Sequence, residues 1–280
     1  MARLQAVGVR ILCPPDYRPQ EVWSFHARDQ QQLCEEVGAG RLVKRFVLDG
    51  RPTRLEIAVG SKEARVSGGQ GSEAFQAACR LLGLGLDPGP FEAAFAQDAY
   101  LGPLIAARPG LRLAQTATAY EAVTWAIMGQ QVNLTFALEL RRTFIRLADV
   151  RLEGAYCYPD PAAAARLDWD ELPRRKFSRA KAETLRRVTE LLLRQELDLA
   201  RPEQLLAVKG VGPWTVQYTL LRGYAHPDCS LHGDAAVKKA LQGVFGQSLT
   251  GSEAEQLLAR YRPHRSLAAA HCWAWLNKQA

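Results

Sequence analysis

Alternating apolar and polar positions in the first quarter of the chain predict a small antiparallel sheet. Leu55, Ile57 and Val59 stand at every second position, with polar or small residues between them, which is the period of a strand with one buried face. An Asp-Gly dipeptide at 49–50, typical of a hairpin turn, separates two such runs within residues 41–66. We therefore expect adjacent antiparallel strands in this segment.

Helical spacing is predicted on both sides of this sheet and through the rest of the chain. Residues 23–37 and 72–82 favour helices, whereas the Gly- and Pro-rich stretch 83–90 breaks the pattern. Beyond it apolar residues recur at steps of three or four, without a convincing alternating run. These positions are Ala137, Leu140, Phe144 and Leu147 and, further on, Leu185, Val188 and Leu192. We expect an α+β domain over residues 1–88 and a mainly helical part over residues 89–280.

The composition is that of a globular protein with room for one large domain or two to three small ones. The 280 residues are 48% hydrophobic and 23% charged, and the formal net charge is +7. An excess of positive charge favours an anionic partner such as nucleic acid. A basic protein without such a partner has the same composition, so charge alone does not decide between the two.

Six cysteines are spread along the chain, and the two closest, Cys13 and Cys34, are 21 residues apart. This spacing excludes a Cys-x-x-Cys zinc or iron–sulfur motif and predicts reduced thiols without a metal. The first ten residues lack the apolar stretch of a signal peptide, and no run of 18 apolar residues occurs. We expect a cytoplasmic protein that does not enter a membrane.

The segment Lys209-Gly210-Val211-Gly212-Pro213 is the most informative in the chain. Glycine permits a backbone turn with positive φ and close approach of a partner, and it leaves N–H groups pointing outward. Proline suits the first position of a helix, so the next helix begins at once and directs its positive end to the same place. Phosphate is the natural ligand of such a turn.

Two further features have both a structural and a functional interpretation. Asp234 follows Gly233 and precedes an apolar-periodic run, as an ordinary helix N-cap does. The helix expected over 179–194 carries five Arg and Lys residues, which form either a phosphate-facing surface or a solvated face. The residues alone leave both questions open.

The run Leu205–Thr215, followed by Asp234, resembles the helix-hairpin-helix DNA glycosylase superfamily. Within it, the segments 106–113, 127–133, 221–224 and 262–266 are similar to the AlkA-type DNA-3-methyladenine glycosylase II. The resemblance extends from about residue 91 to the C-terminus. It implies an α+β fold with an N-terminal antiparallel sheet domain and helices, followed by a two-lobed all-α core. The helix-hairpin-helix would lie at about 202–223, with the active-site cleft between the lobes.

The resemblance also implies a function in base excision repair. Such an enzyme flips alkylated purines of the 3-methyladenine and 7-methylguanine type out of duplex DNA and hydrolyses the N-glycosidic bond, leaving an abasic site. Asp234 would be the catalytic carboxylate, and Gln131 the wedge that fills the gap left by the base, where relatives often have an apolar residue. The base pocket would contain the aromatic residues Trp214, Tyr218, Trp273 and, less certainly aligned, Phe25. The DNA backbone would be held by Lys209, Gly210, Val211 and Gly212.

These aromatic faces would attract cationic bases, which leave as neutral molecules. Members that also nick the strand carry a lysine two residues after the second hairpin glycine, where this chain has Trp214. We therefore expect a monofunctional monomer that binds double-stranded DNA and needs no cofactor or metal. Two alternatives are a non-catalytic helix-hairpin-helix module, in which Asp234 is only a cap, and a glycosylase of the same fold for deaminated or oxidised bases. The roles of Arg222, Arg265 and His232 stay open, and His271 is expected in the core.

Overall fold

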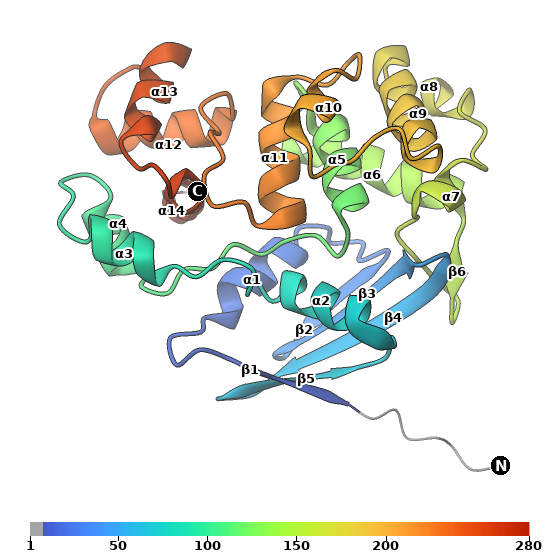
Figure 1. Ribbon diagram of the computed structural model, residues 1–280, viewed down its shortest axis with the longest axis horizontal. Helices are drawn as coiled ribbons and strands as arrows, with labels where there is room; N and C mark the ends of the chain where they lie inside the picture. The colour runs from blue at the N-terminus through green and yellow to red at the C-terminus, as the bar shows by residue number, and fades with distance from the viewer. Residues whose placement is uncertain (1–7, 280) are drawn as a thin grey trace.

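The computed structural model describes residues 8–279, and it consists of a five-stranded sheet beneath two groups of helices (Figure 1). Residues 1–7 and 280 lie outside the described residues, and with them most of the segment that bears on the signal-peptide prediction. No helix among residues 8–279 is long and apolar enough to cross a membrane. The fold is α+β, as the sequence predicts.

The sheet has the order β1-β5-β4-β3-β2, and all of its neighbouring strands are antiparallel. Its strands are β1 (Val9–Leu12), β2 (Glu35–Gly38), β3 (Arg41–Leu48), β4 (Arg51–Val59) and β5 (Glu63–Ser67). Asp49 and Gly50 both have positive φ, at 48° and 72°, which is the geometry of a two-residue hairpin turn. Leu55 and Ile57 are fully buried. The predicted hairpin and its alternating face are confirmed.

The helix predicted over residues 23–37 is wrong in its second half. Helix α1 (Pro19–His26) ends early, Gln32 adopts a positive φ of 49°, and the chain then enters β2. Glu35 explains the difference, because in the strand its carboxylate reaches the buried Lys44 ammonium of β3. This pairing depends on a contact across the sheet, which overrides the local helical pattern.

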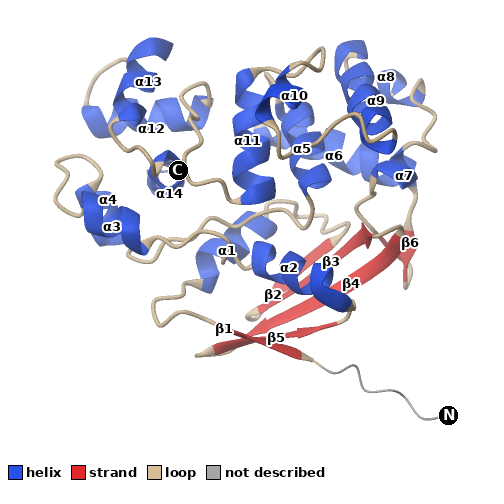
Figure 2. Cartoon of the chain, viewed as in Figure 1, coloured by secondary structure: helices blue, strands red, loops and turns tan. Residues whose placement is uncertain are grey.

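The helices of the remaining chain form two lobes above the sheet (Figures 1 and 2). Helix α2 (Gly71–Leu81), which confirms the prediction over 72–82, covers the sheet. One lobe contains α5 (Ala119–Gly129), α6 (Leu134–Ala148), α7 (Pro161–Ala164), α8 (Glu171–Arg174), α9 (Arg179–Leu193), α10 (Pro202–Leu206) and α11 (Pro213–Tyr224). The other contains α3 (Gly89–Phe95), α4 (Gly102–Ala107), α12 (Ala235–Phe245), α13 (Gly251–Ala259) and α14 (Arg265–Gln279). A two-strand pair, β6 (Arg151–Leu152) and β7 (Ala155–Tyr156), lies between α6 and α7, where no strand is predicted.

A buried cluster of charges fastens the sheet to the helices. The Lys44 ammonium contacts Glu35 and, at 2.6 Å, Glu121 of α5, and Arg141 of α6 contacts both carboxylates. Burial alone would raise the pKa of Glu35, but the positive charges of Arg141 and Lys44 hold that pKa well below its usual range. Strands β2 and β3 of the sheet are thereby connected to α5 and α6 of the first lobe.

Candidate functional site

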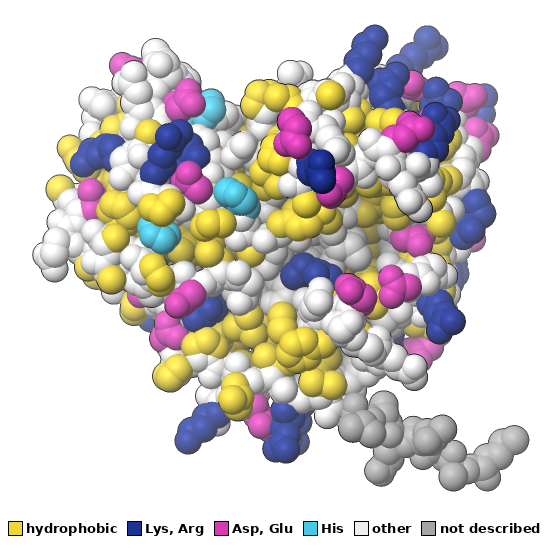
Figure 3. Space-filling view, viewed as in Figure 1, with side chains coloured by type: hydrophobic (Ala, Val, Ile, Leu, Met, Phe, Trp, Pro, Cys, Tyr) yellow, Lys and Arg dark blue, Asp and Glu magenta, His cyan; other side chains and the backbone are white. Residues whose placement is uncertain are grey.

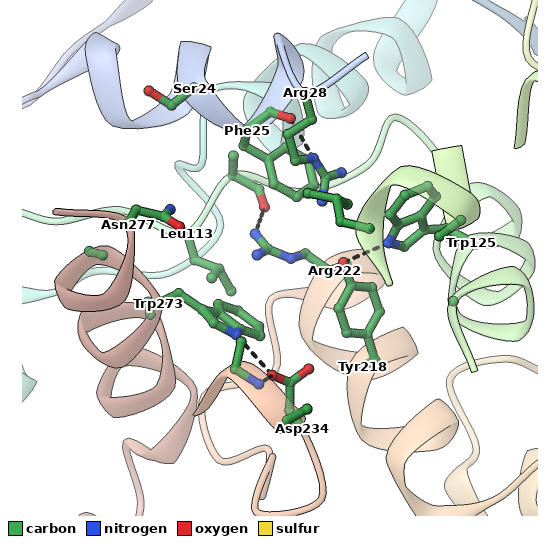
Figure 4. Close-up of a pocket in the computed structure, with 18 of the residues that line it drawn as sticks. Ser24, Phe25, Arg28, Leu113, Trp125, Tyr218, Arg222, Asp234, Trp273 and Asn277 are labelled. Carbon is green, nitrogen blue, oxygen red and sulfur yellow. Dashed lines mark hydrogen bonds between the residues drawn. The ribbon is translucent and has the colours of Figure 1, made fainter. Parts of the chain in front are cut away.

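A cavity of about 840 Å3 opens where α1, α5, α11, α12 and α14 meet. Its wall includes six residues that the sequence analysis assigns to the site, namely Phe25, Gln131, Trp214, Tyr218, Asp234 and Trp273. They come from segments up to 248 residues apart, and Figure 4 shows four of them, Phe25, Tyr218, Asp234 and Trp273, gathered around one space. The structure therefore brings the predicted aromatic and acidic residues together. The hairpin residues 209–212 do not line the cavity.

Asp234 serves as the N-cap of α12 and also faces the cavity. Its Oδ1 accepts hydrogen bonds from the backbone N–H groups of Ala236 and Val237, each at 3.0 Å, as the sequence predicts for a cap. Indole N–H groups supply the other contacts, because Trp273 Nε1 donates to Oδ1 and Trp214 Nε1 donates to Oδ2, both at 3.1 Å. Four donors and a helix N-terminus thus orient this carboxylate and stabilise a negative charge on it.

The aromatic side chains form a continuous wall beside the carboxylate. The ring centroids of Trp214 and Tyr218 are 5.2 Å apart, and those of Tyr218 and Trp273 are 6.4 Å apart. Trp125 of α5 completes this wall, because it lines the cavity and its Nε1 donates to the Tyr218 hydroxyl at 2.9 Å. Sequence reasoning missed Trp125, since its place beside Tyr218 depends on the packing of α5 against α11.

Two arginines occupy the same cavity, which the sequence analysis did not anticipate (Figure 4). The Arg222 guanidinium carbon lies 4.2 Å from the Phe25 ring centroid and 4.9 Å from that of Trp273. The guanidinium carbon of Arg28 lies 3.8 Å from the Phe25 centroid. Burial lowers the pKa of Arg222 to about 10, so its guanidinium stays charged at neutral pH.

A signal for Arg222 was present in the sequence. Trp214, Tyr218 and Arg222 are spaced by four residues along α11 and therefore share one face of that helix. Extending the predicted aromatic face of α11 by one turn would have found Arg222. Arg28, by contrast, lies beyond the end of α1, so the helical spacing does not predict its place.

The hairpin between α10 and α11 has the predicted layout, with Pro213 at the first position of α11. Gly210 has a φ of +94°, and a Cβ atom there would come within 2.0 Å of Thr184 Oγ1. Gly212 has an ordinary φ of −110° and open space in front of its Cα atom. The positive φ expected of both glycines therefore holds for Gly210 alone, while Gly212 leaves room for close approach.

The hairpin amides differ in their availability. The N–H of Val211 donates to Val208 O at 3.0 Å, so this group is already engaged. Within residues 8–279 the N–H groups of Gly210 and Gly212 have no hydrogen-bond acceptor. Lys209 is exposed beside them. A ligand at the hairpin would thus meet two free amides and one ammonium group.

Comparison with known proteins finds relatives in sequence and in fold. No model of a protein family matches the sequence. The chain is 31% identical over 183 residues to "DNA-3-methyladenine glycosylase 2" of Escherichia coli, covering 62% of this chain and 63% of that protein. It is 24% identical over 179 residues to "DNA-3-methyladenine glycosylase" of Bacillus subtilis, covering 59% of each. The structure matches a "3-methyladenine dna-glycosylase from Archaeoglobus fulgidus" with a TM-score of 0.83 and 20% identity, covering 97% of this chain and 99% of that one.

The chain is therefore similar in sequence to DNA-3-methyladenine glycosylases and has the fold of a solved glycosylase of that name. This chain aligns with about three fifths of the length of each of these curated relatives. The structural match covers 97% of this chain and so includes the N-terminal sheet. In that part of the chain the sequence resembles the family only in the predicted order of elements.

In this glycosylase fold the predicted wedge loop is fastened to the hairpin. Gln131 is exposed between α5 and α6 and has a φ of +53°, a conformation that L-residues seldom adopt. The neighbouring Gln130 side chain donates to Gly210 O at 3.0 Å and to Thr215 Oγ1 at 2.9 Å. Lys181 Nζ donates to the carbonyl oxygens of Met128 and Gln130, each at 2.7 Å. The loop tip and the hairpin therefore form one connected unit.

Several other basic residues form ion pairs within the protein. Lys and Arg side chains gather over α8 and α9 at the upper right of Figure 3, but Arg186 and Arg187 pair with Glu183 of the same helix. Arg265 forms a two-pronged contact with the Asp228 carboxylate at 2.6 and 2.8 Å, so it is an internal strut. Lys181, also on α9, instead holds the wedge loop.

The histidines lie apart from the carboxylate chemistry. His271 is buried in the core, as predicted, and burial lowers its pKa to about 4. His232 is half-buried, and its Nδ1 shares a hydrogen bond with Ser230 Oγ at 3.0 Å. Among the residues described, no group of three His, Cys, Asp or Glu side chains could hold a metal ion.

Proposed function

We propose that this chain is a monofunctional DNA glycosylase that flips alkylated purines out of duplex DNA and hydrolyses their N-glycosidic bond. The observation that carries the proposal is the Asp234 carboxylate, held by four N–H donors in the wall of an aromatic cavity. A cavity of about 840 Å3 is within the size range of ligand sites and admits a flipped purine. The curated relatives are named as DNA-3-methyladenine glycosylases.

The chemistry follows from the place of the carboxylate. When the bond between sugar C1′ and the base nitrogen breaks, the electron pair leaves with the base and positive charge develops on the sugar. Asp234 stabilises this oxocarbenium-like centre, because its negative charge is fixed before the reaction begins. A water molecule then adds to C1′ and gives up its proton, to Asp234 or to solvent, leaving an abasic site.

DNA would be held away from the reacting atoms. The free amides of Gly210 and Gly212 and the N-terminus of α11 suit a backbone phosphate, a contact that carries no information about sequence. The net charge of +7 supports an anionic partner. Gln131 would enter the gap left by the flipped base. Action as a monomer in the cytoplasm stays a prediction.

The absence of a strand-nicking step is also part of the proposal. A lyase needs an amine that attacks C1′ and forms a Schiff base. No lysine is among the cavity-lining residues within the described part of the chain, and Trp214 stands at the position where lyases of this superfamily have their lysine. Lys209 is exposed and does not line the cavity.

The direct test is base release from a duplex with one 7-methylguanine, followed by chromatography of the free base and a separate gel for strand breaks. We expect free 7-methylguanine and an intact strand until alkali is added. Borohydride present during the reaction should trap no covalent adduct. A trapped adduct would overturn the monofunctional assignment, and the absence of free base from any alkylated duplex would overturn the glycosylase itself.

The competing hypothesis of a non-catalytic DNA-binding module makes a different prediction. Such a module needs the hairpin but gives no reason for two indole N–H groups to converge on a helix cap. It would bind duplex DNA and abasic DNA without releasing a base at any enzyme concentration. A duplex panel with alkylated, deaminated and oxidised bases separates this module, and the same-fold alternatives, from the proposed enzyme.

A further inference from the structure

The cavity contains two positively charged side chains, Arg222 and Arg28, that have no role in the proposed reaction so far. Trp273 lies between the two charges, because its indole N–H donates to Asp234 while its ring face lies 4.9 Å from the Arg222 guanidinium carbon. Figure 4 shows Arg222 reaching into the middle of the space, with Arg28 and Phe25 on its other side. A flipped base beside Asp234 would therefore have guanidinium groups at its far edge.

These guanidinium groups have more donors than acceptors. Arg222 is only 7% exposed; its Nη1 donates to Ala114 O, and the Tyr218 hydroxyl is its other polar side-chain neighbour. Its Nε is buried without an acceptor within residues 8–279. Arg28 donates from Nε to Phe25 O at 2.7 Å, and neither arginine has an ion pair in this part of the chain.

Other buried arginines of the protein are compensated. Arg141 contacts Glu35, Glu121 and Asp29, and Arg112 lies within 4.0 Å of two carboxylates. Leaving a buried charge without a partner is costly unless a ligand supplies one. The unpaired arginine in the aromatic cavity is therefore expected to meet an acceptor there.

We propose that Arg222, assisted by Arg28, forms a leaving-group subsite that binds a carbonyl oxygen of the flipped base. This inference rests on the proposed function and adds to it a preference among bases. Oxo-purines, whether the cationic 7-methylguanine or the neutral hypoxanthine, offer such an oxygen. Purines with an amino group at the same position, such as 3-methyladenine, offer a donor and would face the guanidinium without a hydrogen bond.

The subsite also acts on the bond that breaks. For a neutral oxo-purine the electron pair of the C1′–N bond moves to the base, which departs as an anion with charge on its carbonyl oxygen. A guanidinium at that oxygen stabilises the anion, while Asp234 stabilises the sugar cation, and the base later takes a proton from solvent. A cationic base leaves neutral and gains nothing from this positive charge, which repels it before cleavage.

Four duplexes, each with a different damaged base, distinguish the effect of a carbonyl group from the effect of positive charge on the base. Hypoxanthine is neutral with a carbonyl and 7-methylguanine is cationic with one, whereas 1,N6-ethenoadenine is neutral without a carbonyl and 3-methyladenine is cationic without one. Single-turnover release rates are measured for each with wild-type protein and with Arg222→Met, Arg28→Met and Arg65→Met. Arg65 is an exposed residue of β5, far from the cavity, and controls for the loss of one positive charge.

In Arg222→Met we expect hypoxanthine release to fall roughly ten- to a hundredfold, the value of a hydrogen bond to a charged group. Release of 7-methylguanine should fall less, and release of 3-methyladenine should stay the same or rise. Arg28→Met should lower the release of hypoxanthine relative to 3-methyladenine by a smaller factor. Arg65→Met should leave this ratio of release rates unchanged. Arg28→Met also carries the test if loss of the Ala114 contact prevents Arg222→Met from folding.

Two outcomes overturn this inference in distinguishable ways. Equal losses on all four bases in both variants would mean that the arginines are only structural, with the glycosylase activity intact. No release of any of the four bases by wild-type protein would overturn the proposed function, and the subsite with it.

Discussion

Helices α11 and α12 both begin with backbone N–H groups that have no partner inside the helix, but the two helices satisfy these donors differently. Helix α11 begins at Gly212, without a side-chain cap and with open space before it. Helix α12 begins at Asp234, whose carboxylate binds the first amides of the helix and two indole N–H groups. The first helix start leaves its donors for a ligand, whereas the second satisfies its donors with a carboxylate and directs that charge into a cavity. In the proposed enzyme, DNA binding and bond cleavage would thereby be separated in space.

The largest effect is expected when the charge of Asp234 is removed. Asp234→Asn keeps the N-cap oxygen but turns the acceptor of the Trp214 indole N–H into an amide donor, so the free energy of unfolding should fall by about 1–3 kcal/mol. Base release should fall by roughly 10²–10³ or more, since a preorganised charge at the developing cation is lost. Single-turnover release and urea unfolding measure the two quantities. A variant that keeps more than a tenth of the wild-type rate would reduce Asp234 to a cap.

The stability of the fold should depend on pH because two histidines are buried. Burial lowers the pKa of His26 and of His271 to about 4, from the ordinary value of 6.5. The unfolded chain therefore binds more protons between pH 6.5 and pH 4, and stability should fall as the pH falls through this range, by up to roughly 3 kcal/mol for each histidine.

Urea unfolding at pH 7 and pH 4.5 measures the loss, and His271→Phe should flatten the dependence. A stability independent of pH in this range would show that the two histidines ionise freely in the folded protein. Base release by Asp234 variants should therefore be measured above pH 6.5, where these histidines do not change the stability of the fold.

The two hairpin glycines should respond differently to the same substitution. Gly210→Ala forces a side chain into a φ of +94° and against Thr184, so it should cost about 1–3 kcal/mol of stability. Gly212→Ala meets open space at a φ of −110° and should cost less than about 0.5 kcal/mol. Urea unfolding of both variants checks the difference. Equal losses would show that the conformation of Gly210 is not what the hairpin requires.

A bulkier residue at Gly212 tests the grip without disturbing the fold. Gly212→Val fills the open space through which a phosphate would approach, so duplex affinity should fall about tenfold, the equivalent of one weakened phosphate contact. Fluorescence anisotropy with an abasic duplex measures the affinity, and Gly212→Ala is the matched control. Unchanged affinity in the valine variant would place the DNA backbone elsewhere.

Local signals in the sequence predicted the parts of the fold that depend on neighbours along the chain. The Asp49-Gly50 turn, the Pro213 helix start and the Asp234 cap each need only a few adjacent residues. By contrast, the end of α1 depends on Glu35 meeting Lys44 across the sheet. Trp125 and Arg28 join the cavity only because α5 and α1 pack against α11, so no local pattern could place them there.

The division between grip and chemistry is tested most directly by single-turnover release with Asp234→Asn and Gly212→Val over a range of protein concentrations. At saturating protein, Gly212→Val should reach the wild-type rate, since only its affinity is reduced. Asp234→Asn should bind as tightly as wild type and stay slow at every concentration. The account is contradicted if saturation restores Asp234→Asn, or if Gly212→Val stays slow when all of the DNA is bound.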